Sequence, residues 1–262
     1  MIRESIAVIL FSVVLGAAIF SRTSESTSFT KSVSRVPVVV ELFTSEGCSS
    51  CPPADALLRR FDAQPFPAAE LIVLSEHVDY WNHIGWTDPY SSHAYSERQS
   101  AYGDRLHLDG VYTPQMIVDG AHEFVGSNSD DAQKAIAKAT GNSKIAVRIT
   151  NAKLEGDTLH VHIEAGPLPA GTRSADVILI AALNHAESQV AAGENSGRHL
   201  THVAVVRALK KSGSVAPSQS FSQDVALKLE KPANATDLRA IALVQEPGAG
   251  KILGAAQERL SK

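Results

Sequence analysis

The chain has 262 residues, of which 44% are hydrophobic and 20% are charged, and this is the usage of a globular protein that can bury a sizeable core. The formal net charge of −4 and the lack of any basic stretch argue against nucleic-acid binding. Only two cysteines occur, and they lie close together. Length and composition therefore predict one or two domains and direct attention to the cysteine pair.

The N-terminus has the pattern of an export segment. A positive start, Met1–Arg3, precedes a continuous apolar run from Ile6 to Phe20, which is short for a membrane span. We expect residues 1–20 to be a signal peptide or, alternatively, an uncleaved anchor, which would be the chain's only membrane contact. Residues 21–35 are expected to be a tether. The folded part is then periplasmic or secreted, where a disulfide can persist.

Strand and helix patterns alternate from residue 36 to residue 140. Such alternation predicts a central sheet with helices on both faces. The dipeptide Asp119-Gly120 is a strong hairpin signal, and Ser127 or Ser129 is expected to cap the last helix. In chain order, the predicted elements are strand Val36–Phe43, helix Ala54–Phe61, strand Glu70–His77, helix Ser91–Leu106, strands Gln115–Asp119 and His122–Val125, and a final helix.

The pattern changes after residues 141–143, where short strands with turn signals between them replace the helices. This pattern of short strands and turns predicts a β-sandwich over residues 145–260. The predicted strands are Lys144–Thr150, Thr158–Ala165, Asp176–Leu183, His202–Leu209, Phe221–Leu229, Leu238–Gln245 and Lys251–Ala256.

The two cysteines lie where the first predicted strand gives way to a helix, in the order Cys48-Ser49-Ser50-Cys51. A thiol at a helix N-terminus faces unpaired backbone N–H groups and the positive end of the helix dipole, which stabilise its thiolate. We therefore predict a redox-active pair, with Cys48 as the exposed attacking thiolate and Cys51 as the resolving thiol. Ser49 and Ser50 can donate hydrogen bonds to the Cys48 sulfur. The alternatives are a permanent structural disulfide and a metal-binding thiol pair.

An aromatic loop containing Tyr80, Trp81 and Trp86 follows the second predicted strand. Loops at the carboxyl ends of strands are where α/β sheets bind ligands, so these side chains are candidates for substrate binding near the thiols. The alternative is that they cover the core or the second half. His77 and Asp79, at the start of the loop, are candidates for proton transfer or metal binding, although a histidine at a strand end more often only forms a hydrogen bond.

Ten histidines raise the question of a metal site. His160 and His162 share one face of a predicted strand, and His199 and His202 lie near Glu194 in the sequence. No HExxH motif, second cysteine pair or calcium-loop pattern accompanies them. We therefore expect no metal or other cofactor, and we expect the scattered histidines to lie at the surface.

The order of elements, with a Cys-X-X-Cys pair at a helix start, resembles the thioredoxin fold. This resemblance implies that Thr113-Pro114 is a cis-proline segment that faces the dithiol and offers its backbone to a substrate peptide. It also implies a buried acid for proton transfer on the preceding strand, for which Glu41 is the nearest candidate. Because the loop before Cys48 is about one residue longer than in thioredoxins, the direction of the Glu41 side chain stays open.

A closer resemblance covers nearly the whole exported part of the chain. The segments VELFTSEGCSSCPPADALL, HVDYWNHIGWTDPY, ERQSAY, VYTPQMIVDG and GENSGRHLTHVAVVRAL are similar to the secreted bacterial family named domain of unknown function 1223. This resemblance implies a thioredoxin-like domain followed by a β-rich one.

These observations predict an α/β protein with a thioredoxin-like domain (βαβ-α-ββα) at residues 36–140 and a β-sandwich-like domain at residues 145–260. The predicted function is that of an exported thiol–disulfide oxidoreductase. It would act through Cys48 and Cys51 on the thiols or disulfides of other exported proteins. One alternative is a non-catalytic thioredoxin-fold binding protein with a structural disulfide. The other is a thiol site for copper or zinc.

Overall fold

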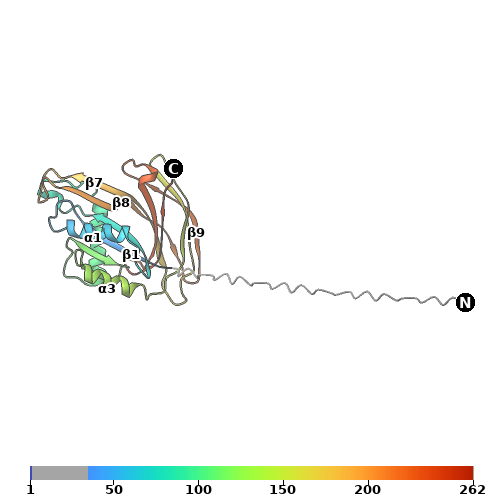
Figure 1. The fold of residues 1–262 in the computed structure, drawn as a ribbon. Coiled ribbons are helices and arrows are strands. Elements are labelled where there is room, and N and C mark those ends of the chain that lie inside the picture. The colour runs from blue at the N-terminus through green and yellow to red at the C-terminus, as the bar shows by residue number, and fades with distance from the viewer. Residues whose placement is uncertain (2–34, 262) are drawn as a thin grey trace. The chain divides into compact units, whose positions relative to one another are not determined.

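The computed structural model describes Met1 and residues 35–261 (Figure 1). The expected signal peptide or anchor beyond Met1, and the tether up to residue 34, lie outside the described residues. Within the described part, no helix is long and apolar enough to cross a membrane. From Arg35 onward the chain forms one compact unit.

Every element predicted between residues 36 and 140 is present, with small differences at its ends. The cap of the last helix was predicted wrongly: the Asn128 side chain, rather than Ser127 or Ser129, accepts from the backbone N–H groups of Asp130 and Asp131. The elements are β1 (Val36–Thr44), α1 (Pro52–Ala63), β2 (Ala69–His77), the 3₁₀ turn η1 (Asn82–Ile84), α2 (His93–Leu106), β3 (Gln115–Val118), β4 (His122–Val125) and α3 (Ser129–Ala139).

The second half is strand-rich, as its pattern predicts, and two of its strands are much longer than expected. These are β7 (Ala175–Gln189) and β8 (His199–Val215). The other elements are β5 (Val147–Glu155), β6 (Thr158–Ala165), β9 (Phe221–Lys228), the 3₁₀ turn η2 (Ala235–Asp237), β10 (Leu238–Gln245) and β11 (Ile252–Arg259).

The strands of the described residues form two sheets. The large sheet has eight strands in the order β11-β10-β7-β8-β2-β1-β3-β4, and the small antiparallel sheet has the order β5-β6-β9. Strands β1 and β2 are parallel, whereas β3 is antiparallel to β1. A short parallel pairing between Ser75 of β2 and Val205 of β8 joins the first half of the chain, residues 36–140, to the second half, residues 145–260. The large sheet is therefore continuous between residues 36–140 and 145–260, and β7, β8, β10 and β11 extend it.

Alternate residues of β1 face different helices. Leu42 and its neighbours two residues apart pack with Leu58 of α1 and Ile136 of α3. The residues between them face the other side, where Phe43 packs with Tyr102 of α2. Helices α1 and α3 thus cover one face of the large sheet, and α2 covers the other. This two-sided burial explains why β1 has a nearly continuous apolar sequence.

The small sheet packs face to face against β7 and β10. Leu159 and Ile163 of β6 share one core with Leu179 of β7 and Ala242 of β10. The next residues along these strands, including Ile180 and Ile241 (both fully buried), belong to a separate core on the other side. The result is a strand-rich mixed α/β fold with a large mixed sheet and a second antiparallel sheet.

The hairpin predicted at Asp119-Gly120 is confirmed. Both residues have positive φ, 53° and 64°, which suits the tight turn between β3 and β4. A Cβ atom on Gly120 would lie 2.2 Å from the carbonyl oxygen of Gly250, so only glycine fits there. The Asp119 carboxylate also pairs with Lys144 at 2.8 Å and accepts from the Val39 backbone N–H. This turn therefore ties the first half to the second.

A buried ion pair forms another tie between the halves. Arg239 of β10 is fully buried and donates to both carboxylate oxygens of Asp62, in the last turns of α1, at 2.5 and 3.1 Å. It also donates to the Asn184 side chain at 2.9 Å. Removing one partner of such a pair leaves an uncompensated charge in the interior, which costs more than the pair itself contributes.

We expect Asp62→Ala to lower the free energy of unfolding by about 3 kcal/mol, because Arg239 would keep its charge without a carboxylate partner. Urea unfolding of the mature chain measures this change. Asp109→Ala, at an exposed loop position, is the matched control and should change stability by less than about 0.5 kcal/mol. Equal effects of the two substitutions would contradict the role assigned to the buried pair.

Candidate functional site

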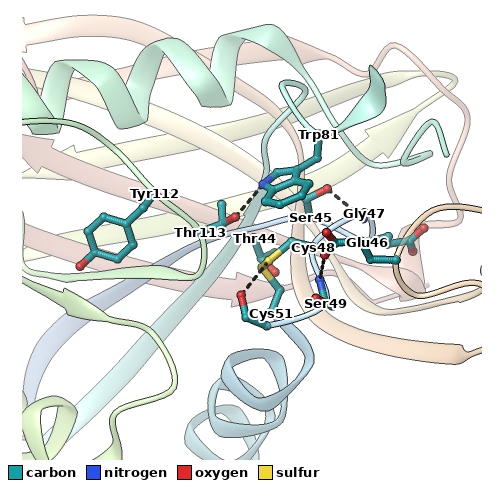
Figure 2. The surroundings of a disulfide bond; sticks show 12 residues. Thr44, Ser45, Glu46, Gly47, Cys48, Ser49, Cys51, Trp81, Tyr112 and Thr113 are labelled. Carbon is teal, nitrogen blue, oxygen red and sulfur yellow. Dashed lines mark hydrogen bonds between the residues drawn. A yellow bond between two sulfur atoms is a disulfide. The ribbon is translucent and has the colours of Figure 1, made fainter. Parts of the chain in front are cut away.

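The predicted disulfide is present at the start of α1. Strand β1 ends at Thr44, a short turn follows, and Cys48 and Cys51 are bonded with their Cα atoms 5.5 Å apart (Figure 2). Cys51 occupies the N-cap position of α1, and Pro52 and Pro53 begin the helix, where a missing N–H costs nothing. The Ala54 and Asp55 N–H groups bond to the Cys51 carbonyl oxygen, so the feature of the helix start that favours a negative charge on the pair is the positive end of the helix dipole.

The prediction that Cys48 is exposed is wrong. Both Cys48 and Cys51 have 0% of their surface accessible, although Ser49 and Ser50 between them are exposed. The predicted hydrogen bond to the sulfur is present for one serine: the Ser50 hydroxyl donates to Cys48 Sγ at 3.3 Å. The sequence did not predict this burial because the segments that hold the disulfide turn come from elsewhere in the chain.

One of these segments is the aromatic loop. A Cβ on Gly47 would lie 3.1 Å from Trp81 Cβ, so the backbone just before Cys48 passes directly against Trp81. The Trp81 indole N–H donates to Thr113 Oγ1 at 2.7 Å (Figure 2). The Thr113-Pro114 bond is cis, as the resemblance implied. Trp81, the Thr113-Pro114 segment and the disulfide are therefore brought together, as predicted.

The second segment is the loop between β7 and β8, residues 190–198. Asn195 is fully buried, and its side-chain amide donates to the carbonyl oxygens of Glu46 at 2.8 Å and Cys48 at 2.9 Å. Next to it, a Glu194 carboxylate oxygen accepts from the Ser49 backbone N–H at 3.0 Å. This loop therefore fixes the disulfide turn from the second half of the chain. The sequence indicated only a long loop here.

A buried cluster of charged side chains lies behind the disulfide turn. His202 of β8 is 1% exposed and lies between two carboxylates, with Nε2 3.4 Å from Glu46 and Nδ1 3.6 Å from Asp55 of α1. Burial opposes the charge on His202, but Asp55 and then Glu46 together raise its pKa to about 10. Trp86 donates to the other Glu46 oxygen at 2.8 Å. The expectation of a surface histidine is wrong here, because the buried ring lies between two buried acids and supplies a positive charge to both.

His77 belongs to the same cluster. Its ring packs edge-to-face against His202 with centroids 4.7 Å apart, and Nδ1 lies 2.7 Å from Asp88. Burial alone would raise the pKa of Asp88, but His77 and backbone N–H groups lower it. Asp79 lies elsewhere: it accepts from the Ser96 hydroxyl in α2 at 2.6 Å. The two candidates for proton transfer are therefore not brought together.

Glu41, the third candidate for proton transfer, faces away from α1. It lies on the face of β1 covered by α2, where Arg98 Nε donates to it at 2.7 Å. Burial raises the pKa of nearby Glu76 well above its usual value, although Arg98 opposes this. Tyr80 also faces α2, where its hydroxyl donates to Gln99. The alternation of β1 explains this outcome, because residues 42 and 44 rather than 41 share the α1 side.

The described residues contain no group of three or more His, Cys, Asp or Glu side chains placed to hold a metal ion. The site they form is a covered disulfide at a helix start, backed by a buried cluster of acidic and histidine side chains.

These features define the chain as a strand-rich mixed α/β protein with a disulfide site shared between its halves. Residues 39–245 match the family described as "Protein of unknown function (DUF1223)", and the chain belongs to that family.

The fold has similar solved structures. A protein from Agrobacterium tumefaciens is 30% identical, with a TM-score of 0.66, over 85% of this chain and 94% of that one. HBP35 of Porphyromonas gingivalis is 19% identical, with a TM-score of 0.63, over 87% of this chain and 76% of that one, and this likeness concerns the fold alone. Comparison with curated proteins gave no match.

The raised pKa of His202 gives a testable pH dependence. A group whose folded-state pKa lies above its unfolded value of about 6.5 stabilises the protein fully below that pH, and this contribution is lost as the pH rises toward about 10. We expect His202→Gln to destabilise the protein by about 2 kcal/mol or more at pH 7 and by less at pH 10. Urea unfolding at both pH values measures the difference, and a gap that stays constant or widens would contradict this electrostatic account.

The two hydrogen bonds from Asn195 to the disulfide turn, here called the Asn195 clamp, give a prediction for the rate at which a reductant reaches the disulfide. Asn195→Ala removes both hydrogen bonds to the disulfide turn, so we expect reduction by a small phosphine to be roughly tenfold faster, which corresponds to about 1.4 kcal/mol in the opening step. Ser196→Ala is the control, since this exposed hydroxyl donates to the Ala191 carbonyl within the same loop. Equal rates for the two variants would show that the clamp does not limit access.

Proposed function

We propose that the Cys48–Cys51 pair performs thiol–disulfide exchange with other exported proteins, within a thioredoxin-like arrangement formed by residues 36–140. The strand order β2-β1-β3-β4 supports this arrangement, with β1 and β2 parallel and the hairpin strand β3 antiparallel to β1. The placement of α1 and α3 on one face and α2 on the other also agrees with it.

The observation that carries the proposal is the position of the pair at the first turn of α1, beside the Thr113-Pro114 segment. Pro114 packs close to the start of α1, since a Cβ on Gly126 would contact both Pro114 and Ala54. The positive end of the helix dipole favours a thiolate, and Ser50 already donates to the Cys48 sulfur. The backbone of the half-buried Thr113 would then pair with a partner peptide once the cover moves.

The exchange balances as two thiolate attacks. In the reduced protein, the Cys48 thiolate attacks a partner disulfide, forms a mixed disulfide and releases one partner thiolate, which takes up a proton. The Cys51 thiolate then attacks the Cys48 sulfur, restores the internal disulfide and releases the second partner thiol. Two electrons pass to the partner, and the reverse sequence oxidises a partner dithiol. Because the sulfurs are covered, the cover must move before either attack.

The burial of both sulfurs favours a second candidate, a non-catalytic thioredoxin-fold binding protein that keeps its disulfide closed. A bridge between residues only three apart in sequence removes little chain entropy, so stability alone explains it poorly. Resistance of the disulfide to mild reductant and the absence of exchange with model substrates would favour this second candidate.

The cysteine variants test the leading proposal. We expect the purified mature chain to catalyse reduction or exchange of a model protein disulfide. Cys48→Ser should abolish turnover because it removes the attacking sulfur, whereas Cys51→Ser should accumulate mixed disulfides, detectable by mass spectrometry. Ser49→Ala, an exposed position between them, should retain turnover and is the control. Full turnover by Cys48→Ser would refute the assignment.

A further inference from the structure

Glu194 brings a negative charge from the second half of the chain to the disulfide. Its carboxylate accepts the backbone N–H of Ser49, the residue that follows Cys48, at 3.0 Å. Its neighbour Asn195 is buried and bonded to the carbonyl groups of Glu46 and Cys48, so the position of Glu194 is set by an anchored backbone. The Ser49 side chain and then the Ser49 backbone N–H lower the pKa of Glu194 by hydrogen bonding, so this carboxylate is ionised at neutral pH.

This contact places the carboxylate where a thiolate would be stabilised. Pro52 and Pro53 supply no N–H groups, so the backbone donors next to Cys48 are the amides of Ser49 and Ser50 in the turn before α1. One of them, on Ser49, is already occupied by an anion, and that anion repels a second negative charge one residue away. The disulfide carries no charge, so Glu194 does not disfavour the oxidised form.

We propose that Glu194 is a positioning residue for the redox pair, which acts through the Ser49 amide to disfavour the Cys48 thiolate and so to stabilise the disulfide. The inference rests on the proposed function only in assuming that the pair can be reduced. It gives the second half of the chain a direct part in setting the reduction potential. Glu46, Asp55, Asp88 and His202 are charged groups of the buried cluster beside the pair, and all of them are unchanged in the variants below.

The test is Glu194→Gln, which removes the charge but keeps an oxygen that can accept the Ser49 N–H. Equilibration of the mature chain with dithiol redox buffers measures the reduction potential. Alkylation of the reduced protein at a series of pH values, in a Cys51→Ser background, measures the Cys48 pKa. We expect the equilibrium to shift toward the reduced form by about threefold to tenfold, where tenfold corresponds to about 30 mV for a two-electron couple. The Cys48 pKa should fall in parallel.

The control is Glu164→Gln, which removes an exposed carboxylate from β6 in the small sheet and should leave both quantities unchanged. Because Glu194 is solvent-exposed, high salt should reduce the difference between wild type and Glu194→Gln. An unchanged potential and an unchanged Cys48 pKa in Glu194→Gln would overturn the inference, and so would shifts in the opposite direction. A protein that shows the expected shifts but no exchange with partners would refute the proposed function and leave this inference standing.

Discussion

The buried imidazole of His202 is the interaction on which the arrangement of the site depends. It comes from β8, yet it lies between Glu46, in the turn before the disulfide, and Asp55, in the first turns of α1. Two buried carboxylates without a cation would be costly enough to favour protonation or rearrangement of the turn. The disulfide segment therefore takes this position only when the second half of the chain supplies the positive charge.

The same principle recurs wherever the halves meet. Arg239 of β10 is buried against Asp62 of α1, and Gln245 of β10 is hydrogen-bonded to Tyr102 of α2. Apolar burial alone is tolerant of small shifts, whereas a buried charge or amide has few positions in which its partners are satisfied. These polar contacts therefore help to fix how β7, β8, β10 and β11 align with the helices. The interface between the two halves of the chain therefore both aligns the strands of the large sheet and forms the disulfide site.

Local signals in the sequence predicted the local structure well. The Cys48–Cys51 pair at a helix start, the Asp119-Gly120 hairpin and the alternating strands of the second half each depend on residues close together in the chain, and each is present. The cis bond before Pro114 came from the family resemblance, since residue patterns give it only a low prior.

What the sequence did not predict depends on contacts between distant segments. Ser49 and Glu194 are 145 residues apart, and no periodicity relates them. The burial of Cys48 follows from such contacts, as does the pairing of His202 with Glu46. The direction of Glu41 stayed open for a different reason. Side chains alternate along a strand, so an uncertainty of one residue in the loop after β1 is enough to leave the face of Glu41 undetermined.

A covered disulfide is compatible with the proposed exchange, because the cover affects the rate of exchange whereas the reduction potential is an equilibrium property. A cover that closes equally over the oxidised and reduced pair slows both directions of exchange and leaves the reduction potential unchanged. A charge beside the thiolate changes the potential, because only the reduced pair can carry a negative charge. Asn195 binds uncharged carbonyl groups and so affects the rate of exchange, whereas Glu194 carries a charge and so affects the reduction potential. Adjacent residues of one loop can therefore set how often a partner reaches the sulfurs and which redox state the pair favours once it does.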